Sequence, residues 1–352
     1  MKKLNEKDWK PSEIQDIFSI SSGVRLESRN RSLGSRPFVG ALDNSNGVVQ
    51  FVDDTNASLD HNVLGVNYNG NGMGIGFYHP YECIFSDDVK RFHLKDVDDT
   101  LETLLFSKTL IEKQRDKFGY LYKFNANRMA ATSIMLPVSD SGKPDYQYMA
   151  EYVQTHRNAM LAKYRIYIEK RIAEIGEYVE IPALNQKKWA AVRLTDVFDM
   201  VSRGKRLKKA DHIEGDMPYI SSTARTNGND GTCGNEVGVR VFEHCLTLAN
   251  SGSVGSCFYH PYQFVASDHV TALQRSGMSE FAYLALSALV RRLGEKYNFN
   301  REINDARISR ERIMLPVTDS GEPDYEYMEQ YIKNMMLQKY RQYLTFIDGK
   351  RK

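Results

Sequence analysis

The sequence predicts an α+β protein built from two homologous domains, each followed by a long helix. Its 352 residues contain one segment twice: IMLPVSDSGKPDYQYM at 134–149 returns as IMLPVTDSGEPDYEYM at 313–328, with three of sixteen positions changed. FYHPY likewise occurs at 77–81 and again at 258–262. A repeat of about 180 residues is far longer than the roughly 20 to 50 residues of a solenoid or propeller unit, so each copy is a domain.

Within each copy, short segments rich in β-branched and aromatic residues alternate with Gly, Asn and Asp. This pattern is typical of short strands in a compact sheet. Examples are PFVGAL and GVVQFV in the first copy and PYIS, VGVRVF and LTLA in the second. Asn-Gly at 46–47 and 227–228 predicts tight turns, and helices are predicted at about 99–115 and 278–293. The globular part of each copy is therefore α+β.

A long helix is predicted after each copy of IMLPV. Pro-Asp at 144–145 and 323–324 suits a helix start, because proline fits the first turn and an early acid favours the positive end of the helix dipole. Apolar side chains then recur at helical spacing over about 28 residues, which is roughly 40 Å. Helices of that length need a partner, and we expect an antiparallel coiled coil between them. The residues predicted to pair are Met149, Val153, Met160, Tyr164, Met328, Ile332, Met335 and Tyr340.

These elements divide the chain into five predicted parts. They are a globular domain at 1–143, a long helix at 144–176, a linker at 177–188, a second globular domain at 189–322 and a second long helix at 323–352. With 41% hydrophobic and 26% charged residues, the composition is that of an ordinary globular protein, and no apolar run approaches the roughly 18 residues of a membrane helix. The opening MKKLNEKDWK lacks the apolar core of a signal peptide, so we expect a cytoplasmic protein.

The cysteines and the duplicated histidines are predicted to be structural. Cys83, Cys233, Cys245 and Cys257 do not repeat between the copies and lack the closely spaced pairs that zinc sites use. His79 and His260 lie in identical FYHPY segments with no acid or second histidine at ligand spacing, which favours a scaffold role. No metal site is therefore expected.

Two basic segments fall at equivalent places when the copies are aligned with an offset of 181 residues. One follows Gly23 and is rich in arginine, and the other follows Gly204 and holds three lysines and an arginine within five residues. The net charge of +2 neither requires nor excludes nucleic acid, because clustering on one face matters more than the total. Matching basic segments in two diverged copies favour binding of phosphates or guanine edges over a merely solvated surface.

The order of parts resembles that of the DNA-specificity subunit of Type I restriction-modification systems. It is especially similar to that of the related subunits in Type IIB systems. The motifs that carry the resemblance are LNxKxW, DIFSISSG at 16–23 or DVFDMVSRG at 196–204, the Asn-Gly segment, FYHPY, YxFN and IMLPVxDSGxPDYxYM. They cover essentially the whole chain. The resemblance implies two target recognition domains, each reading one half of a split sequence in double-stranded DNA. It also implies that the helices set the spacing and dock methyltransferase or endonuclease subunits.

The resemblance further implies a non-catalytic chain without a cofactor of its own, with S-adenosylmethionine and Mg²⁺ expected in the partner subunits. In agreement, no Asn/Asp-Pro-Pro-aromatic tetrapeptide of an amino-methyltransferase occurs, and GNGMGIG at 70–76 lacks the spacing of a dinucleotide fingerprint. The Pro-Asp pairs lack the Glu-x-Lys of a nuclease, so helix capping is favoured there. Two alternatives stay open: a two-headed protein-binding scaffold on a coiled-coil stalk, and an enzyme of unrecognised type.

Positions that differ between the copies within aligned loops are free to read different bases. The predicted DNA-binding residues are Arg25, Arg29, Arg31, Arg36 and Asn44 in the first copy and Arg203, Lys205, Arg206, Lys208, Lys209 and Arg225 in the second. Asn46 and Asn227 are better explained as turn residues. Because the loops diverge, we expect unlike half-sites and an asymmetric target.

Overall fold

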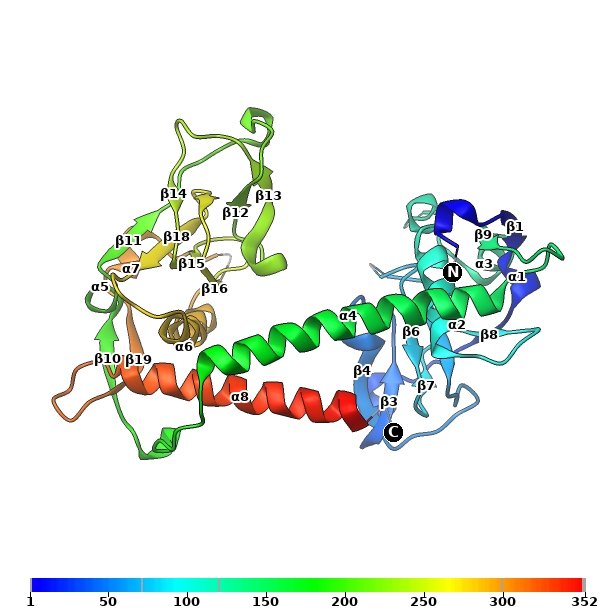
Figure 1. Cartoon of the computed structure of the whole chain (residues 1–352), viewed down its shortest axis with the longest axis horizontal. Coiled ribbons are helices and arrows are strands. Elements are labelled where there is room, and N and C mark those ends of the chain that lie inside the picture. Colours follow the sequence, from blue (N-terminus) through cyan, green and yellow to red (C-terminus); the bar gives the residue numbers. More distant parts are fainter. Residues whose placement is uncertain (1, 71, 120, 299, 350–352) are drawn as a thin grey trace. The chain divides into compact units, whose positions relative to one another are not determined.

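A computed structural model describes residues 2–70, 72–119, 121–298 and 300–349 of the chain (Figure 1). Phe299 of the YNFN segment and Asn71 of the GNGMGIG segment lie outside the described residues. The chain forms two compact units, Met1–Tyr164 and Arg165–Lys352. The boundary between them falls within the long helix α4 (Tyr146–Ile175).

The first unit combines short strands with three helices and the beginning of α4. Its elements are β1 (Trp9–Glu13), α1 (Ile14–Ile17), β2 (Phe18–Ser22), β3 (Leu33–Val39), β4 (Val48–Val52), β5 (Val63–Asn67), β6 (Gly76–His79), β7 (Ile84–Phe85), β8 (Val89–Leu94), α2 (Leu101–Glu112), α3 (Ala126–Ala130) and β9 (Ser133–Pro137). One sheet has the order β2-β8-β5-β6 and is antiparallel, and a second has the order β4-β3-β7, in which β3 and β7 are parallel. Strands β1 and β9 pair separately.

The second unit repeats this plan. Its elements are β10 (Lys188–Arg193), α5 (Leu194–Val197), β11 (Met200–Arg203), β12 (Met217–Ile220), β13 (Asn229–Cys233), β14 (Val241–Phe242), β15 (Cys245–Ala249), β16 (Cys257–His260), β17 (Phe264–Ala266), β18 (Val270–Gln274), α6 (Glu280–Arg291), α7 (Asp305–Ile308), β19 (Arg312–Val317) and α8 (Tyr325–Gly349). The sheets have the orders β11-β18-β15-β16 and β13-β12-β17-β14, and β10 pairs with β19. Of the predicted strand VGVRVF, only Val241 and Phe242 are β14. The predicted α+β class is confirmed.

The single offset of 181 residues between the copies is wrong by one residue at one strand. Cys245 pairs with His260 as Val63 pairs with His79, so β15 is offset from β5 by 182 residues, although FYHPY keeps the offset of 181. The extra residue before β15 is compensated in the loop that follows the strand.

The duplicated LNxKxW and PDY segments form the same clasp in both units. The indole of Trp9 donates a hydrogen bond to the carbonyl of Leu4 at 2.9 Å, and Trp189 repeats this contact with Leu184 at 3.0 Å. Lys7 pairs with Asp145, as Lys187 does with Asp324, each at 2.6 Å. The motif therefore ties the start of each unit to the start of its long helix.

Both Pro-Asp pairs act at helix starts, as predicted, but through the acid alone. Asp145 accepts a hydrogen bond from the backbone N–H of Tyr148 at 3.0 Å, which is the bond of an N-cap residue. Pro144 precedes the helix and pairs with Val138 in a β-bridge. Burial raises the pKa of the Asp145 carboxyl, but the bonds from Lys7 and Tyr148 outweigh it and leave the pKa below its ordinary value.

Replacing the capping acid should separate the cap from the ion pair. We expect Asp145→Ala to lower the free energy of unfolding by about 2 kcal/mol, because the N-cap and the partner of Lys7 are both lost. Asp145→Asn should cost less than half of that, since asparagine caps helices about as well as aspartate. Urea unfolding of both variants measures the difference, and equal losses would contradict the capping role.

The last turns of α4 lie antiparallel to α8 in the second unit (Figure 1). Arg165 pairs with Asp348, whereas Arg171, later in α4, bonds with Tyr340, earlier in α8. Ile168 of α4 and Leu337 of α8 are fully buried on these stretches. The predicted antiparallel pairing is thus confirmed for the part of α4 that belongs to this unit.

Half of the residues predicted to pair the two long helices lie elsewhere. Met149 is buried in the core of the first unit, and Val153 packs against that core. Met328 and Ile332 belong to the core of the second unit. Their helical spacing reflects the first turns of each long helix, which complete a globular core instead of facing the other helix.

The other four predicted seam residues vary in their surroundings. Tyr340 bonds with Tyr167 and Arg171 of α4. Met160 and Met335 are 66% and 40% exposed, and Tyr164 is 42% exposed. The residues that bury an apolar surface on the facing stretches of α4 and α8 are instead Ile168, Ile175, Leu337 and Ile347.

Each unit buries its own apolar core, and the FYHPY histidines and the cysteines belong to that interior. His79 and His260 are fully buried, as expected of scaffold residues, and burial lowers the pKa of each ring to about 4. The four cysteines are buried and unpaired. The described residues include no group of three or more His, Cys, Asp or Glu side chains arranged for a metal ion. They also include no helix both long and apolar enough to cross a membrane.

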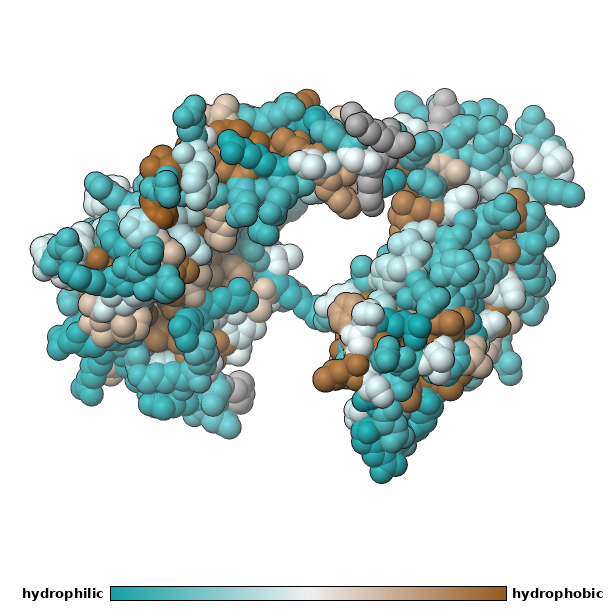
Figure 2. All heavy atoms as spheres, turned by 90° about the horizontal axis from the view of Figure 1, so that it is seen from below, coloured by the Kyte–Doolittle hydropathy of each residue, from teal (hydrophilic) through white to brown (hydrophobic). Residues whose placement is uncertain are grey.

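Hydrophilic side chains predominate on the face drawn in Figure 2, and apolar ones form small separate patches there. Exposed apolar side chains do occur on strand β4, where Val49 is 44% and Phe51 55% exposed. Isolated exposed apolar residues are normal on protein surfaces, but adjacent ones on a strand call for an explanation.

Candidate nucleic-acid interface

A glycine begins each basic segment because the backbone leaves no room for a side chain. A Cβ atom added to Gly23 would lie 2.0 Å from the carbonyl oxygen of Ser86, and one added to Gly204 would lie 2.1 Å from that of Ser267. The backbone N–H after each glycine donates to the short strand beside it: Val24 to Phe85 at 2.8 Å, and Lys205 to Ala266 at 3.0 Å. The segments therefore leave the frame at the same point in both units.

The end of the strand before each glycine is held by an arginine. In the first unit, Arg91 donates to the carbonyl oxygen of Ser22 at 3.0 Å. In the second unit, Arg240 donates to the carbonyl oxygen of Arg203 at 2.6 Å. The two arginines are not equivalent in the sequence, so the two units fix the end of this strand with different residues.

The basic segments are also held in their middle. The carbonyl oxygen of Leu26 accepts two bonds from the Arg31 guanidinium at 3.0 and 3.2 Å, and that of Leu207 accepts one from the hydroxyl of Tyr219 at 3.3 Å. Phe38 occupies the position of Tyr219 in the first unit and has no hydroxyl, so Arg31 supplies the donor there.

Four of the predicted residues in the second unit form a free basic surface. Lys205, Arg206, Lys208 and Lys209 are all exposed. Within the part of the chain that the structure describes, no carboxylate forms an ion pair with any of them. Their charges are therefore available for phosphate groups.

The first unit presents a weaker basic surface. Arg25 and Arg29 are 74% and 79% exposed, and both pair with Glu27, at 3.8 and 2.8 Å. Exposed ion pairs of this kind contribute little to stability, and a phosphate competes with them readily. The net charge of this triplet is +1, compared with +4 for the four side chains of the second unit.

Three predicted DNA-binding arginines also have partners inside the protein. Arg31 holds the carbonyl of Leu26, as described. Arg36 pairs with Glu82 at 3.0 Å and donates to the carbonyl of Asp54 at 2.7 Å. Arg203 donates to the carbonyl of Ile303 at 3.2 Å. Because these guanidinium groups have acceptors within the fold, fewer of their N–H donors are available for phosphate groups.

The remaining predicted residues lie at the Asn-Gly turns. Asn44 and Arg225 immediately precede the short 3-10 helices Ser45–Gly47 and Thr226–Gly228. Asn46 and Asn227 have φ angles of 51° and 54°, in the left-handed region that asparagine tolerates, which confirms the predicted turn role. The side chain of Asn44 donates to its neighbour Asp43 at 3.0 Å.

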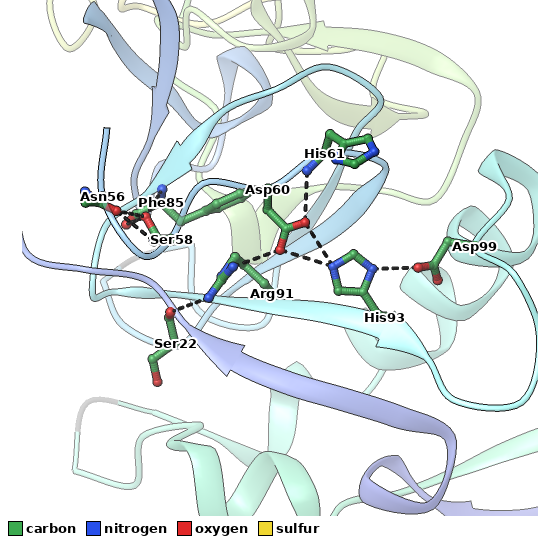
Figure 3. A network of polar contacts seen from close by, with 9 residues as sticks. All are labelled: Ser22, Asn56, Ser58, Asp60, His61, Phe85, Arg91, His93 and Asp99. Carbon is green, nitrogen blue, oxygen red and sulfur yellow. Dashed lines mark hydrogen bonds and ion pairs between the residues drawn. The ribbon is translucent and has the colours of Figure 1, made fainter. Parts of the chain in front are cut away.

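A polar network in the first unit braces the strands next to its basic segment (Figure 3). Asp60 accepts from Arg91 at 2.9 Å and contacts the ring of His93 at 3.1 Å. The other ring nitrogen of His93 lies 2.6 Å from a carboxylate oxygen of Asp99, just before α2. The bond with Asp99 raises the pKa of His93, burial opposes it, and the bond with Asp60 adds to it, which brings the pKa to about 9. Sequence reasoning missed this network because its members are scattered over forty residues.

This network predicts how the stability of the first unit depends on pH. The folded-state pKa of His93 of about 9 lies above the unfolded value of about 6.5, so the charged ring stabilises the fold fully below pH 6.5. That contribution is lost as pH rises through about 9. Unfolding monitored from pH 6 to 10 should therefore show a decline that His93→Gln removes. The exposed His61→Gln is the control, and an unchanged decline in His93→Gln would contradict the assignment.

Comparison with known proteins identifies the repeated unit. A family model described as the Type I restriction modification DNA specificity domain matches twice, over residues 6–177 and 186–343. Each match includes one globular unit and most or all of its long helix. The Type II restriction enzyme BgcI specificity subunit S.BcgI from Heyndrickxia coagulans is 45% identical over 163 residues, which are 46% of this chain and 48% of that protein. The chain thus aligns with about half the length of this curated relative.

A solved structure has a similar fold. The crystal structure of a Type-I restriction-modification system S subunit from M. genitalium matches with a TM-score of 0.52 and 14% identity. The match covers 99% of this chain and 94% of that one. At 14% identity the likeness concerns the fold alone.

Proposed function

The chain belongs to the family of Type I restriction modification DNA specificity domains, and from this membership we propose that it recognises a bipartite, asymmetric sequence in double-stranded DNA. The observation that carries the proposal is the pair of exposed basic segments on equivalent frames. Phosphate contacts from such segments position a protein on DNA, and nearby side chains that differ between the units read the bases. Residues 1–143 and 189–322 would be the two target recognition domains.

In this proposal the chain is a non-catalytic subunit, and methylation and cleavage belong to partners that hold S-adenosylmethionine and Mg²⁺. The helices at 144–176 and 323–352 would set the distance between half-sites and dock the methyltransferase or the fused endonuclease. Exposed apolar side chains on α4 support a docking role, because Met160 and Ile166 are 66% and 67% exposed. Large apolar side chains in such positions are typical of protein contact surfaces.

Methylation mapping tests the proposal directly. The chain is purified together with its methyltransferase partner, and genomic DNA treated with the complex is sequenced for modified bases. A split methylated motif with unlike halves is expected. A symmetric motif would contradict the asymmetry, and methylation without any motif would contradict a specificity function.

A protein-binding scaffold is distinguished by the salt dependence of binding. Each phosphate contact adds about 0.9 to the slope of log affinity against log salt, so four free cations in the second unit imply a slope near −3.6 or steeper on duplex DNA. A scaffold for an acidic protein would not prefer a DNA duplex over a single strand of equal charge.

A further inference from the structure

Each unit has a β-bulge in the strand that follows its Asn-Gly turn, β4 in the first unit and β13 in the second. The side chains at the two bulges differ. The pairing of β3 with β4 skips Val49, which is therefore the extra residue of a β-bulge. The equivalent irregularity between β12 and β13 includes Asp230, the residue aligned with Val49. Bulges turn a side chain away from the regular sheet and occur often beside functional sites.

Beside Asp230 the second unit has an open cavity of about 550 Å³. The basic segment contributes Lys209 to its wall, followed by His212, and β13 contributes Asp230 and Thr232. His269, from the turn before β18, completes this polar lining. The cavity thus joins a phosphate-binding surface to a set of hydrogen-bonding side chains.

The cavity exists because side chains that fill this place in the first unit are smaller in the second. In the first unit Gln50 meets Arg31 at 3.5 Å, and Arg31 stacks on Phe38 with its guanidinium carbon 4.3 Å from the ring centroid. The residue aligned with Gln50 is Gly231, and a Cβ atom there would meet nothing within 4 Å. The residue aligned with Arg31 is His212, which has a shorter side chain.

The polar groups of the cavity are complementary to a base edge. The exposed carboxylate of Asp230 accepts a hydrogen bond from the hydroxyl of Ser221 at 3.1 Å, and a carboxylate has further acceptor capacity. Lys209 supplies a donor in the same lining. In the major groove, both a cytosine–guanine and an adenine–thymine pair present an amino donor beside an acceptor.

We infer that this cavity binds the major-groove edge of one base pair through its exocyclic amino group, with Asp230 as the acceptor. The inference rests on the proposed function, because it requires that the second unit binds duplex DNA. In the first unit the corresponding side chains are apolar: Val49 stands in place of Asp230, and Phe51 in place of Thr232. An exposed apolar pair suits the methyl group of thymine, so the two units would select different bases with the same part of the fold.

The test compares sequence selection by the wild type and by variants of the full chain in complex with its methyltransferase partner. The probe is a pool of DNA duplexes with randomised positions. The wild type should select cytosine or adenine at one position of one half-site. Asp230→Ala, which removes the acceptor, should reduce this preference by about 5- to 150-fold at that position, while the other half-site stays unchanged. Val49→Ala should relax a position in the other half-site only.

A second arm identifies the amino group. Duplexes that lack only this group, with 2-pyrimidinone for cytosine or purine for adenine, should bind the wild type more weakly by the same factor. They should bind Asp230→Ala without further loss, because the two changes remove one shared contact. The exposed Glu236→Gln, which removes a charge from the segment after β13, should leave selection unchanged.

The outcomes separate this inference from the proposed function. A wild type that selects a bipartite motif, with Asp230→Ala keeping it unchanged, would overturn the inference alone. Weaker binding of Asp230→Ala to all sequences alike would also overturn it, since Asp230 would then act on the whole interface. A wild type without any selected motif would overturn the proposed function as well.

Discussion

Removing the four free charges of the second basic segment should lower the affinity for duplex DNA by about three orders of magnitude at 0.1 M salt. The variant combines Lys205→Gln, Arg206→Gln, Lys208→Gln and Lys209→Gln. Each lost phosphate contact reduces the slope of log affinity against log salt by about 0.9, so the slope should become shallower by about 3.6. Binding of a duplex without the target motif, measured between 50 and 200 mM salt, gives this slope.

The first unit offers the matched control. Arg25→Gln with Arg29→Gln should change the slope by less than about 1.8, because Glu27 already neutralises part of their charge. The thermal stability of both variants should stay close to that of the wild type, since all the replaced side chains are exposed. An unchanged slope in the fourfold variant would show that the second basic segment does not contact phosphates.

Filling the space at the start of a basic segment should have the largest effect on stability. Gly23→Ala places a Cβ atom 2.0 Å from the carbonyl oxygen of Ser86, far inside van der Waals contact. Backbone on both sides must move, which should lower the free energy of unfolding by about 3 kcal/mol or more. Gly204→Ala should behave alike, because its Cβ would lie 2.1 Å from the oxygen of Ser267.

Gly119→Ala is the control for the loss of glycine itself. A Cβ atom at Gly119 meets nothing within 4 Å, and the backbone there does not need a left-handed conformation. Its effect should stay within about 1 kcal/mol and can be stabilising, because alanine restricts the unfolded chain. Equal stability of Gly23→Ala and the wild type in urea unfolding would contradict the close approach.

Repetition made much of the fold predictable. The duplicated IMLPV segments are strands β9 and β19, the helices expected at about 99–115 and 278–293 are α2 and α6, and long helices follow both Pro-Asp pairs. Binary pattern and turn residues specify such elements locally. The helix seam was harder to predict, because apolar spacing does not say whether Met149 faces the other helix or its own domain.

The candidate site was only partly predictable for a related reason. From the sequence alone, Arg31 and Arg36 cannot be distinguished from Arg206. In the structure, the first two donate hydrogen bonds to backbone carbonyl oxygens. Which carbonyl lies within reach depends on tertiary contacts that a linear sequence does not show. Alignment of the copies after the Asn-Gly turns does place Asp230 opposite Val49. This difference can be assigned to the β-bulge once the strand register is known.

A chimera tests the central claim most directly, namely that two unlike recognition surfaces on one repeated frame select the two halves of the target. Residues 9–137 are replaced by residues 189–316, so that both globular units carry the second recognition surface between the duplicated tryptophan and IMLP segments. Complexes of the chimera with the proposed methyltransferase partner are then used for methylation mapping. We expect both halves of the new motif to contain the bases that only the second unit selected before. An unchanged motif would contradict the account.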